Sequence, residues 1–160
     1  MTANGKTPAE KMRVLRTDSD NPDFILLVKQ LDAYLAKIDG DEHPFYAQYN
    51  KLDKIKHVIV IYDDETAIAC GAIKIFEPGS MEVKRMYTLP EYRGKGIASK
   101  VLNELEKWAA ELSCAKCILE TGIRMEEAVL LYQKNGYRRI PNYGQYAGVV
   151  NSLCFEKSLS

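Results

Sequence analysis

The sequence lacks the features that mark membrane-spanning, secreted and nucleic-acid-binding proteins. Its longest apolar run, Val58 to Tyr62, is far too short to span a bilayer. The first eight residues contain no apolar core of the kind that a secretory signal peptide needs. Lysine plus arginine equals aspartate plus glutamate at 22 each, so the basic excess of a nucleic-acid binder is missing. We therefore expect a cytoplasmic protein with no membrane partner and no nucleic-acid partner.

Cysteine and histidine are scarce, which bears on metal and redox chemistry. The chain has four cysteines and two histidines. Cys114 and Cys117 form a single C-x-x-C pair without the second pair that zinc sites commonly use. Cys117 also opens an apolar strand, where a thiol usually fills core space. We predict reduced thiols, among them Cys70 and Cys154, and no metal site.

Length and composition are those of one ordinary globular domain. The chain has 160 residues, of which 46% are hydrophobic and 28% are charged. No repeat and no linker composition interrupts it. We expect a flexible N-terminal tail at residues 1–11 and a single domain at residues 12–160.

Apolar periodicity predicts a mixed α/β (α+β) chain. Asn21 and Pro22 have the residue types of a helix cap and first helical position, and Gly40 is the expected end of that helix. Residues 41–53 are either a short second helix or an ordered loop. Further helices are expected at residues 97–112 and 126–134, and strands at residues 12–16, 57–62, 67–76, 81–88, 116–120, 137–140 and 149–156. The strands between residues 57 and 88 are joined by short turns and should be antiparallel, with Gly71 at a bulge or a close backbone approach. Strand 116–120 must run parallel to its predecessor if it joins the same sheet across a helix.

The stretch from Arg93 to Ala98 reads Arg-Gly-Lys-Gly-Ile-Ala and connects a strand to a helix. Two glycines allow a tight turn, and the helix behind them presents unpaired N–H groups and its positive dipole end. This combination is typical of a phosphate-binding loop. It is not a P-loop, whose spacing is absent, and it lacks the third glycine of a dinucleotide-binding loop. Its first glycine also follows Thr88 by six residues, with Pro90 between them.

The segment from Met86 to Ala98 resembles the acyl-CoA motif of the GNAT acyltransferase superfamily. Leu119-Glu120-Thr121 and the segment from Ala128 to Tyr137 resemble later parts of the same family. The resemblance implies a GNAT-type mixed, mostly antiparallel central sheet of six to seven strands flanked by about four helices. It also implies that an acetyl group moves from acetyl-CoA to a primary amine, of a small molecule or an amino acid, by direct attack in a ternary complex. Dimerisation is common in this fold, so a homodimer is among the expectations.

The resemblance also implies which residues hold the cofactor. Backbone N–H groups from Arg93 to Ala98 would bind the pyrophosphate, and those of Met86 and Thr88 would polarise the thioester carbonyl. The full expected cofactor-binding set is Met86, Tyr87, Thr88, Arg93, Gly94, Lys95, Gly96, Ile97, Ala98 and Asn135.

Two residues are candidates for catalysis. Glu82 stands where some family members carry a catalytic glutamate, and would act as the base or as the anchor of the amine. Strand alternation would place Glu82, Met86 and Thr88 on one face. Glu120 or a water molecule is the alternative base. Tyr132 matches the position of the family's common general acid.

The acceptor and one alternative function stay open at this point. Aromatic residues that could line an acceptor pocket are His43, Phe45, Tyr46, Tyr49, Tyr143 and Tyr146. Acidic residues that could attract a cation are Asp39, Asp41 and Glu42, whereas Arg85 or Arg124 would suit a carboxylate. The competing function is a non-catalytic acyl-CoA sensor or partner-binding module on the same fold, and a nucleotide-binding βαβ domain is a third, weaker interpretation.

Overall fold

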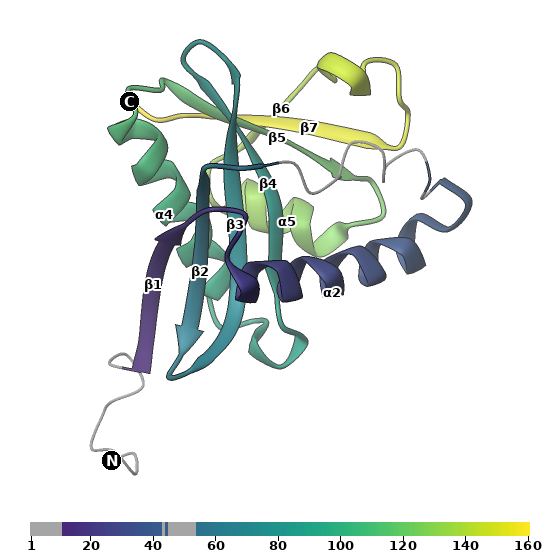
Figure 1. The fold of residues 1–160 in the computed structure, drawn as a ribbon. Coiled ribbons are helices and arrows are strands. Elements are labelled where there is room, and N and C mark those ends of the chain that lie inside the picture. Colours follow the sequence, from purple (N-terminus) through teal and green to yellow (C-terminus); the bar gives the residue numbers. More distant parts are fainter. Residues whose placement is uncertain (1–10, 43, 45–53) are drawn as a thin grey trace.

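A computed structural model describes residues 11–42, 44 and 54–160 of the chain (Figure 1). Seven strands form one sheet in the order β1-β2-β3-β4-β5-β7-β6. The strands are β1 (Met12–Thr17), β2 (His57–Asp63), β3 (Thr66–Glu77), β4 (Ser80–Thr88), β5 (Lys116–Gly122), β6 (Arg138–Ile140) and β7 (Ser152–Ser158). Every pair of neighbours is antiparallel except β4 and β5, which are parallel. The expected mixed, mostly antiparallel sheet is confirmed.

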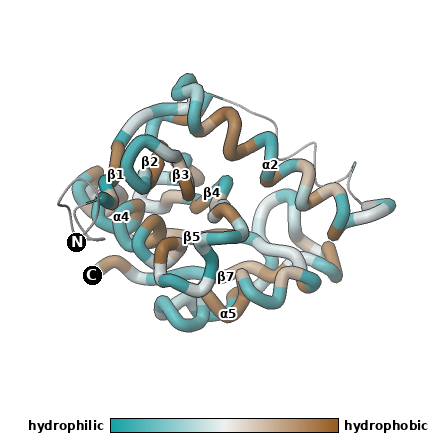
Figure 2. Tube along the Cα trace, turned by 90° about the horizontal axis from the view of Figure 1, so that it is seen from below, coloured by the Kyte–Doolittle hydropathy of each residue, from teal (hydrophilic) through white to brown (hydrophobic). Residues whose placement is uncertain are grey.

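Helices cover both faces of this sheet. The described residues contain three α-helices, α2 (Pro22–Asp39), α4 (Ile97–Glu111) and α5 (Glu126–Lys134), and the 3-10 turns η1 (Gly40–Glu42), η2 (Pro90–Tyr92) and η3 (Gly144–Tyr146). Figure 2 shows α2 on one side of the sheet and α4 and α5 on the other. Of the segment that was expected to be a second helix or a loop, the residues 43 and 45–53 lie outside the described part, as do residues 1–10 of the expected tail.

The first helix begins and ends at the residues that its sequence indicates. The Asn21 side chain accepts a hydrogen bond from the Phe24 amide at 3.0 Å, and Pro22 occupies the first helical position. At the other end Gly40 has a φ of 56°, and its N–H donates to the carbonyl of Ala36. Phe24 is fully buried against the sheet. The cap signals are therefore confirmed, and they fix where the C-terminal end of α2 lies.

The opposite layer packs closely because β3 carries a glycine beneath α4. A Cβ atom on Gly71 would lie 2.7 Å from Cγ1 of Val101 and 3.0 Å from Cδ1 of Leu105. The pairing of β3 with β4 also shifts register between Cys70 and Ala72. Gly71 therefore lies opposite a bulge in the neighbouring strand, and side chains of α4 approach its backbone closely.

The cysteine side chains lie inside the protein. All four are buried and free, and burial raises the pKa of the Cys70 and Cys117 thiols to about 12. Within residues 11–42, 44 and 54–160, no group of three or more His, Cys, Asp or Glu side chains is placed to hold a metal ion. The thiols fill core space, as expected.

The C-terminal strand begins three residues later than the sequence predicts. The Asn142 side chain donates hydrogen bonds to the carbonyls of Val149 and Ser152 at 2.9 and 3.0 Å. Residues 149–151 are thereby held in the loop, and β7 starts at Ser152. No helix in the described part of the chain is long and apolar enough to cross a membrane.

Candidate active site

A bulge in β4 organises the centre of the molecule. Ala72 of β3 pairs with Lys84, and Cys70 pairs with Tyr87. Between these two pairs β3 has one residue and β4 has two. The extra residue is Arg85, whose φ of 60° lies in the left-handed region. Its side chain is buried and donates a hydrogen bond to Asp32 of α2 at 2.9 Å. This ion pair holds the bulge against α2.

The bulge overturns one expectation from the sequence. Alternation was expected to place Glu82, Met86 and Thr88 on one face, but one inserted residue reverses the alternation beyond it. Met86 packs with the core under α4, and Thr88 pairs with Ala69 of that same core. Lys84 pairs with Ala72, which packs with α2. Glu82, two residues from Lys84, therefore faces α2, on the opposite side of the sheet from Met86 and Thr88.

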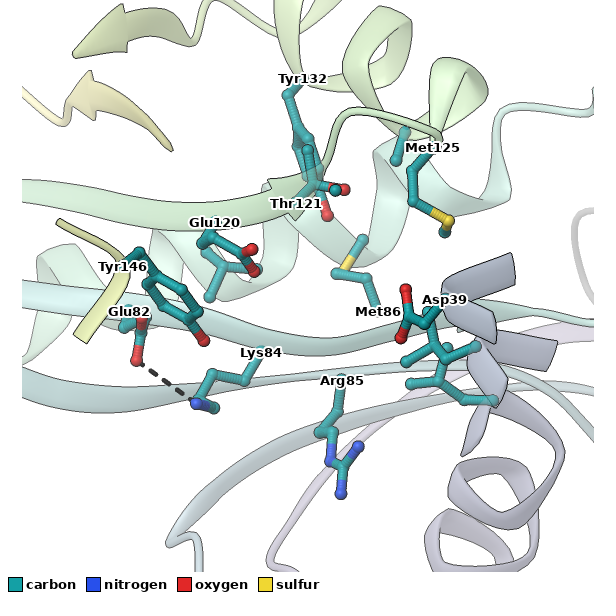
Figure 3. A pocket seen from close by; sticks show the side chains of 15 residues that line it. Asp39, Glu82, Lys84, Arg85, Met86, Glu120, Thr121, Met125, Tyr132 and Tyr146 are labelled. Carbon is teal, nitrogen blue, oxygen red and sulfur yellow. Dashed lines mark ion pairs between the residues drawn. The ribbon is translucent and has the colours of Figure 1, made fainter. Parts of the chain in front are cut away.

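A pocket opens where β4 and β5 separate. Their ladder covers residues 80–82 and 116–118 only, and β5 continues to Gly122 without pairing to β4. Figure 3 shows side chains from both strands, α2 and α5 converging on this gap. The lining residues are Leu31, Leu35, Asp39, Glu82, Val83, Lys84, Arg85, Met86, Glu120, Thr121, Gly122, Met125, Ala128, Tyr132 and Tyr146. Because the gap passes between two strands, residues from opposite faces of the sheet reach one pocket.

Glu82 lies in this pocket with both carboxylate oxygens engaged. The residue is 8% exposed. The Tyr143 hydroxyl donates a hydrogen bond of 2.6 Å to Oε2, and Nζ of Lys84 lies 3.5 Å from Oε1. The Lys84 ion pair is the dashed line in Figure 3. The two partners hold the Glu82 carboxylate in one position.

Glu120, the residue held in reserve by the sequence reasoning, faces Glu82 from β5. The Ser152 hydroxyl donates a hydrogen bond of 2.8 Å to its Oε2. Burial, together with the nearby charge of Glu82, raises the pKa of Glu120 to about 7, although the Ser152 hydrogen bond lowers it. A carboxyl group with this pKa exchanges its proton at neutral pH. The sequence contained no signal for the contact with Ser152.

Tyr132 reaches the same pocket from α5. Its side chain is 6% exposed, and its ring meets that of Tyr137 edge to face with centroids 5.8 Å apart. No group in the described part of the chain hydrogen-bonds to its hydroxyl. Burial, with the nearby charge of Glu120, raises the pKa of Tyr132 above its ordinary value, so the hydroxyl keeps its proton. The structure thus brings the two predicted catalytic residues, Glu82 and Tyr132, together.

The predicted phosphate loop has an open surface and unpaired helix amides. Gly94 and Gly96 have φ values of 77° and 79°, and a Cβ atom on either would meet nothing within 4 Å. The backbone conformation therefore requires glycine, and the space above the loop is free. Helix α4 starts at Ile97 with no side-chain cap and no acidic residue in its first turn. Its first amides, including that of Ala98, are available to an anion.

Some predicted cofactor-binding side chains have partners within the protein. Nε of Arg93 donates to the carbonyl of Thr88 at 3.0 Å, and the guanidinium lies over the rings of Tyr34 and Tyr87 at 5.2 and 5.5 Å from the centroids. Arg93 thereby ties the loop to the end of β4. Tyr87 is buried in the core beneath α2. Sequence spacing did not indicate these contacts.

Lys95 and Asn135 lie at the two sides of the same loop. Nζ of Lys95 lies 5.4 Å from the centroid of the Tyr92 ring, and the residue is exposed. The Asn135 amide donates to the Ser99 hydroxyl at 3.0 Å and to the Leu131 carbonyl at 2.9 Å. Asn135 therefore joins the end of α5 to the first turn of α4.

The candidates for the acceptor site divide into three groups. Asp39 and Tyr146 line the pocket, and Tyr143 holds Glu82. Arg85 is paired with Asp32 of α2, and Arg124 donates to the Ile38 carbonyl of α2 at 3.0 Å. His43, Phe45, Tyr46, Tyr49 and the side chain of Glu42 lie outside the described residues, while Asp41 is exposed.

Comparisons with known proteins identify the family of the chain. The model of the acetyltransferase (GNAT) family matches residues 19–137. A protein of Azospirillum brasilense named IAA acetyltransferase is 33% identical over 143 residues, which make up 84% of this chain and 90% of that protein.

Solved structures share the fold. A Klebsiella pneumoniae protein, provisionally described as an acyl-CoA N-acyltransferase, aligns with a TM-score of 0.78 and 30% identity, over 93% of this chain and 98% of that one. PaiA N-acetyltransferase of Thermoplasma acidophilum, solved in complex with coenzyme A, aligns with a TM-score of 0.67 and 18% identity, over 92% and 98% of the two chains. The family model and the Azospirillum relative each cover most of the chain. The protein is therefore an acyltransferase that belongs to the GNAT acetyltransferase family.

Proposed function

We propose that this enzyme transfers an acetyl group from acetyl-CoA to a primary amine, of a small molecule or an amino acid, by direct attack in a ternary complex. One observation carries the proposal: the gap between β4 and β5 brings Glu82, Glu120 and the Tyr132 hydroxyl to one pocket. Direct transfer needs a base, an acid and a place for the acyl group at one point, and this gap supplies all three.

The donor would bind along the loop from Arg93 to Ala98 and the end of β4. The loop amides and the dipole of α4 suit a pyrophosphate, and the Lys95 side chain adds positive charge. The Leu89 amide donates to the Ile68 carbonyl of β3. Because successive amides of a strand alternate in direction, those of Met86 and Thr88 point to the open β5 side.

These two amides are suited to polarising the thioester carbonyl. A donor aimed at a developing oxyanion lowers the barrier by about 3 kcal/mol where its removal has been measured. The gap beside β4 leaves Met86 and Thr88 without a β5 partner in the ladder. The early end of the β4–β5 ladder thus leaves available the amides that a longer parallel ladder would occupy.

The acceptor end of the pocket favours a cationic amine. Three carboxylates line it, those of Asp39, Glu82 and Glu120, together with two cationic side chains, Lys84 and Arg85. The Arg85 guanidinium is paired with Asp32 of α2. An amine enters as an ammonium ion and must lose a proton before it has a lone pair for attack. Glu82 and Glu120 are the groups that can bind the ion and take this proton.

Tyr132 is suited to protonating the departing thiolate. Its hydroxyl keeps its proton at neutral pH because burial raises its pKa. It also faces the pocket without a hydrogen-bond partner in the described part of the chain, so it can approach a sulfur atom there. Its packing against Tyr137 fixes the direction of the ring.

The proposal is tested by following thiol release from acetyl-CoA over a panel of primary amines. We expect release with at least one cationic amine and only background release without an amine. Tight acetyl-CoA binding with no release on any amine would support the sensor instead. Propionyl-CoA in parallel reactions tests whether the transferred group is acetyl. The cytoplasmic location and the homodimer stay predictions.

A further inference from the structure

The two carboxylates in the pocket differ in what their oxygens contact. Glu82 has a partner on each oxygen, the Tyr143 hydroxyl on Oε2 and the Lys84 ammonium group on Oε1. Glu120 accepts one hydrogen bond, from Ser152 to Oε2. Across residues 11–42, 44 and 54–160, no hydrogen bond or ion pair reaches Oε1 of Glu120. The Glu82 carboxylate is therefore held by a partner on each oxygen, whereas Oε1 of Glu120 is available to a proton.

From this difference we propose that Glu120 takes the proton from the amine, while Glu82, fixed by Tyr143, anchors the ammonium group. The inference rests on the proposed function and assigns the roles within it. It reverses the order of preference that the sequence suggested, in which Glu82 came first. Tyr143 is a positioning residue, since it acts through Glu82.

The charges around Glu120 suit a proton acceptor that works near neutral pH. The groups that face it are Glu82 and Lys84 from β4, Asp39 from α2, Tyr132 from α5, Tyr146 from η3 and Ser152 from β7. Burial and the two acidic neighbours raise its pKa to about 7, against the opposing effects of Ser152 and Lys84. A carboxylate with this pKa accepts a proton more readily than one with an ordinary pKa.

The step balances in atoms and charge. One N–H bond of the bound ammonium ion breaks, and its proton passes to Oε1 of Glu120, directly or through one water molecule. The freed lone pair forms the new C–N bond at the acyl carbon, and the C–S bond breaks. The thiolate takes the Tyr132 proton, and the second nitrogen proton returns to Tyr132. Glu120 then releases its proton to water, which is the net proton of the reaction.

Tyr143 is well placed to hold Glu82 because its own ring is fixed. The ring meets Phe76 edge to face at 5.0 Å between centroids and Tyr146 at 6.0 Å. Its hydroxyl lies 2.6 Å from Oε2 of Glu82, which is 61 positions away in the chain. Tyr143→Phe removes this hydrogen bond and keeps the ring that packs on Phe76.

The experiment compares pH profiles of kcat/KM and kcat with the amine that the wild-type enzyme accepts best. In the wild-type enzyme both parameters should fall as the pH drops below about 7, where Glu120 becomes protonated. This fall is the acid limb of the profile. Glu120→Gln should lose this limb and fall by about 100-fold or more at neutral pH. Its remaining rate should rise with pH as the free amine becomes more abundant. Glu82→Gln and Tyr143→Phe should raise KM for the amine and keep the limb, which should move to lower pH in Glu82→Gln because a charge that raises the pKa of Glu120 is removed.

Ser152→Ala is the second test, and it leaves the carboxyl group in place. It removes a hydrogen bond that lowers the pKa of Glu120, so the acid limb should move up by about one pH unit. Ser152→Thr keeps a hydroxyl and should return the limb to its wild-type position. This pair keeps the inference falsifiable if Glu120→Gln fails to fold.

The results that overturn the inference are distinct from those that overturn the function. If the limb persists in Glu120→Gln and disappears in Glu82→Gln, Glu82 is the base. If it persists in both variants, or does not move in Ser152→Ala, neither carboxylate takes the proton as described. Wild-type enzyme that releases no thiol with any amine overturns the proposed function itself, and the inference with it.

Discussion

Replacing Glu120 by glutamine should make the protein more stable above neutral pH, at the cost of its activity. Burial in the pocket disfavours the charged carboxylate, and raises its pKa from 4.5 to about 7. The unfolded chain exposes the same side chain to water, where it ionises at its ordinary pKa. Folding above neutral pH therefore costs free energy at this position.

The size and sign of the effect follow from linkage. The pKa of Glu120 is higher in the folded protein than in the unfolded chain. Its contribution to the free energy of unfolding is therefore complete below the ordinary pKa of 4.5, and it is lost as the pH rises through about 7. A rise from 4.5 to about 7 corresponds, at ~1.4 kcal/mol per pH unit, to a loss of about 3 kcal/mol across that window. Glutamine is neutral at every pH and keeps an acceptor for the Ser152 hydroxyl. The variant should therefore not lose this part of its unfolding free energy as the pH rises.

Urea unfolding of both proteins at about pH 5 and about pH 8 measures the effect, since this interval covers most of the window. The difference in unfolding free energy, Glu120→Gln minus wild type, should increase by about 2 kcal/mol between these two pH values. Taking this difference removes the contribution of titrating groups that do not interact with Glu120. A difference that is the same at both pH values would refute the reasoning, because it would mean that burial does not perturb Glu120.

Three other substitutions, with a fourth as a control, test the proposed acid, the proposed donor loop and the packing of α4. Tyr132→Phe should lower kcat by about 100-fold or more and leave acetyl-CoA affinity, measured by calorimetry, unchanged; an unchanged kcat would leave Tyr132 with a packing role only. Gly96→Ala should destabilise the protein by about 1–2 kcal/mol, because of its φ of 79°, and weaken coenzyme A binding in a thermal-shift titration. Gly79→Ala, with a φ of 84° in the turn between β3 and β4, is the matched control and should leave that binding intact; equal binding by both variants would remove the loop from the donor site. Gly71→Ala should cost about 1–3 kcal/mol in urea unfolding, because its Cβ would lie 2.6 Å from Sδ of Met86. A neutral result there would show that α4 and Met86 can shift without loss of packing.

Much of the fold could be predicted because its signals are local. Helix α2 has its cap at Asn21 and its end at Gly40, three and four residues from the groups that they bond. The meander from β2 to β4 follows from short turns between β-branched runs. The start of β7 could not be predicted, because it depends on the side chain of Asn142, which holds the carbonyls of Val149 and Ser152.

The sequence by itself determined the order of the elements, the glycine loop before α4 and the candidates Glu82 and Tyr132, because each rests on neighbours along the chain. Only the tertiary structure decided how the site is arranged. The bulge at Arg85, held by Asp32 from α2, turned Glu82 to the face opposite Met86.

The partners of the two carboxylates were decided in the same way. Tyr143 and Ser152 lie 61 and 32 positions from Glu82 and Glu120 in the chain. Contacts at these separations leave no periodic trace in the sequence. The pKa of Glu120 depends on how much water the folded chain excludes from its carboxyl group, and that quantity exists only after β4, β5 and β7 have come together.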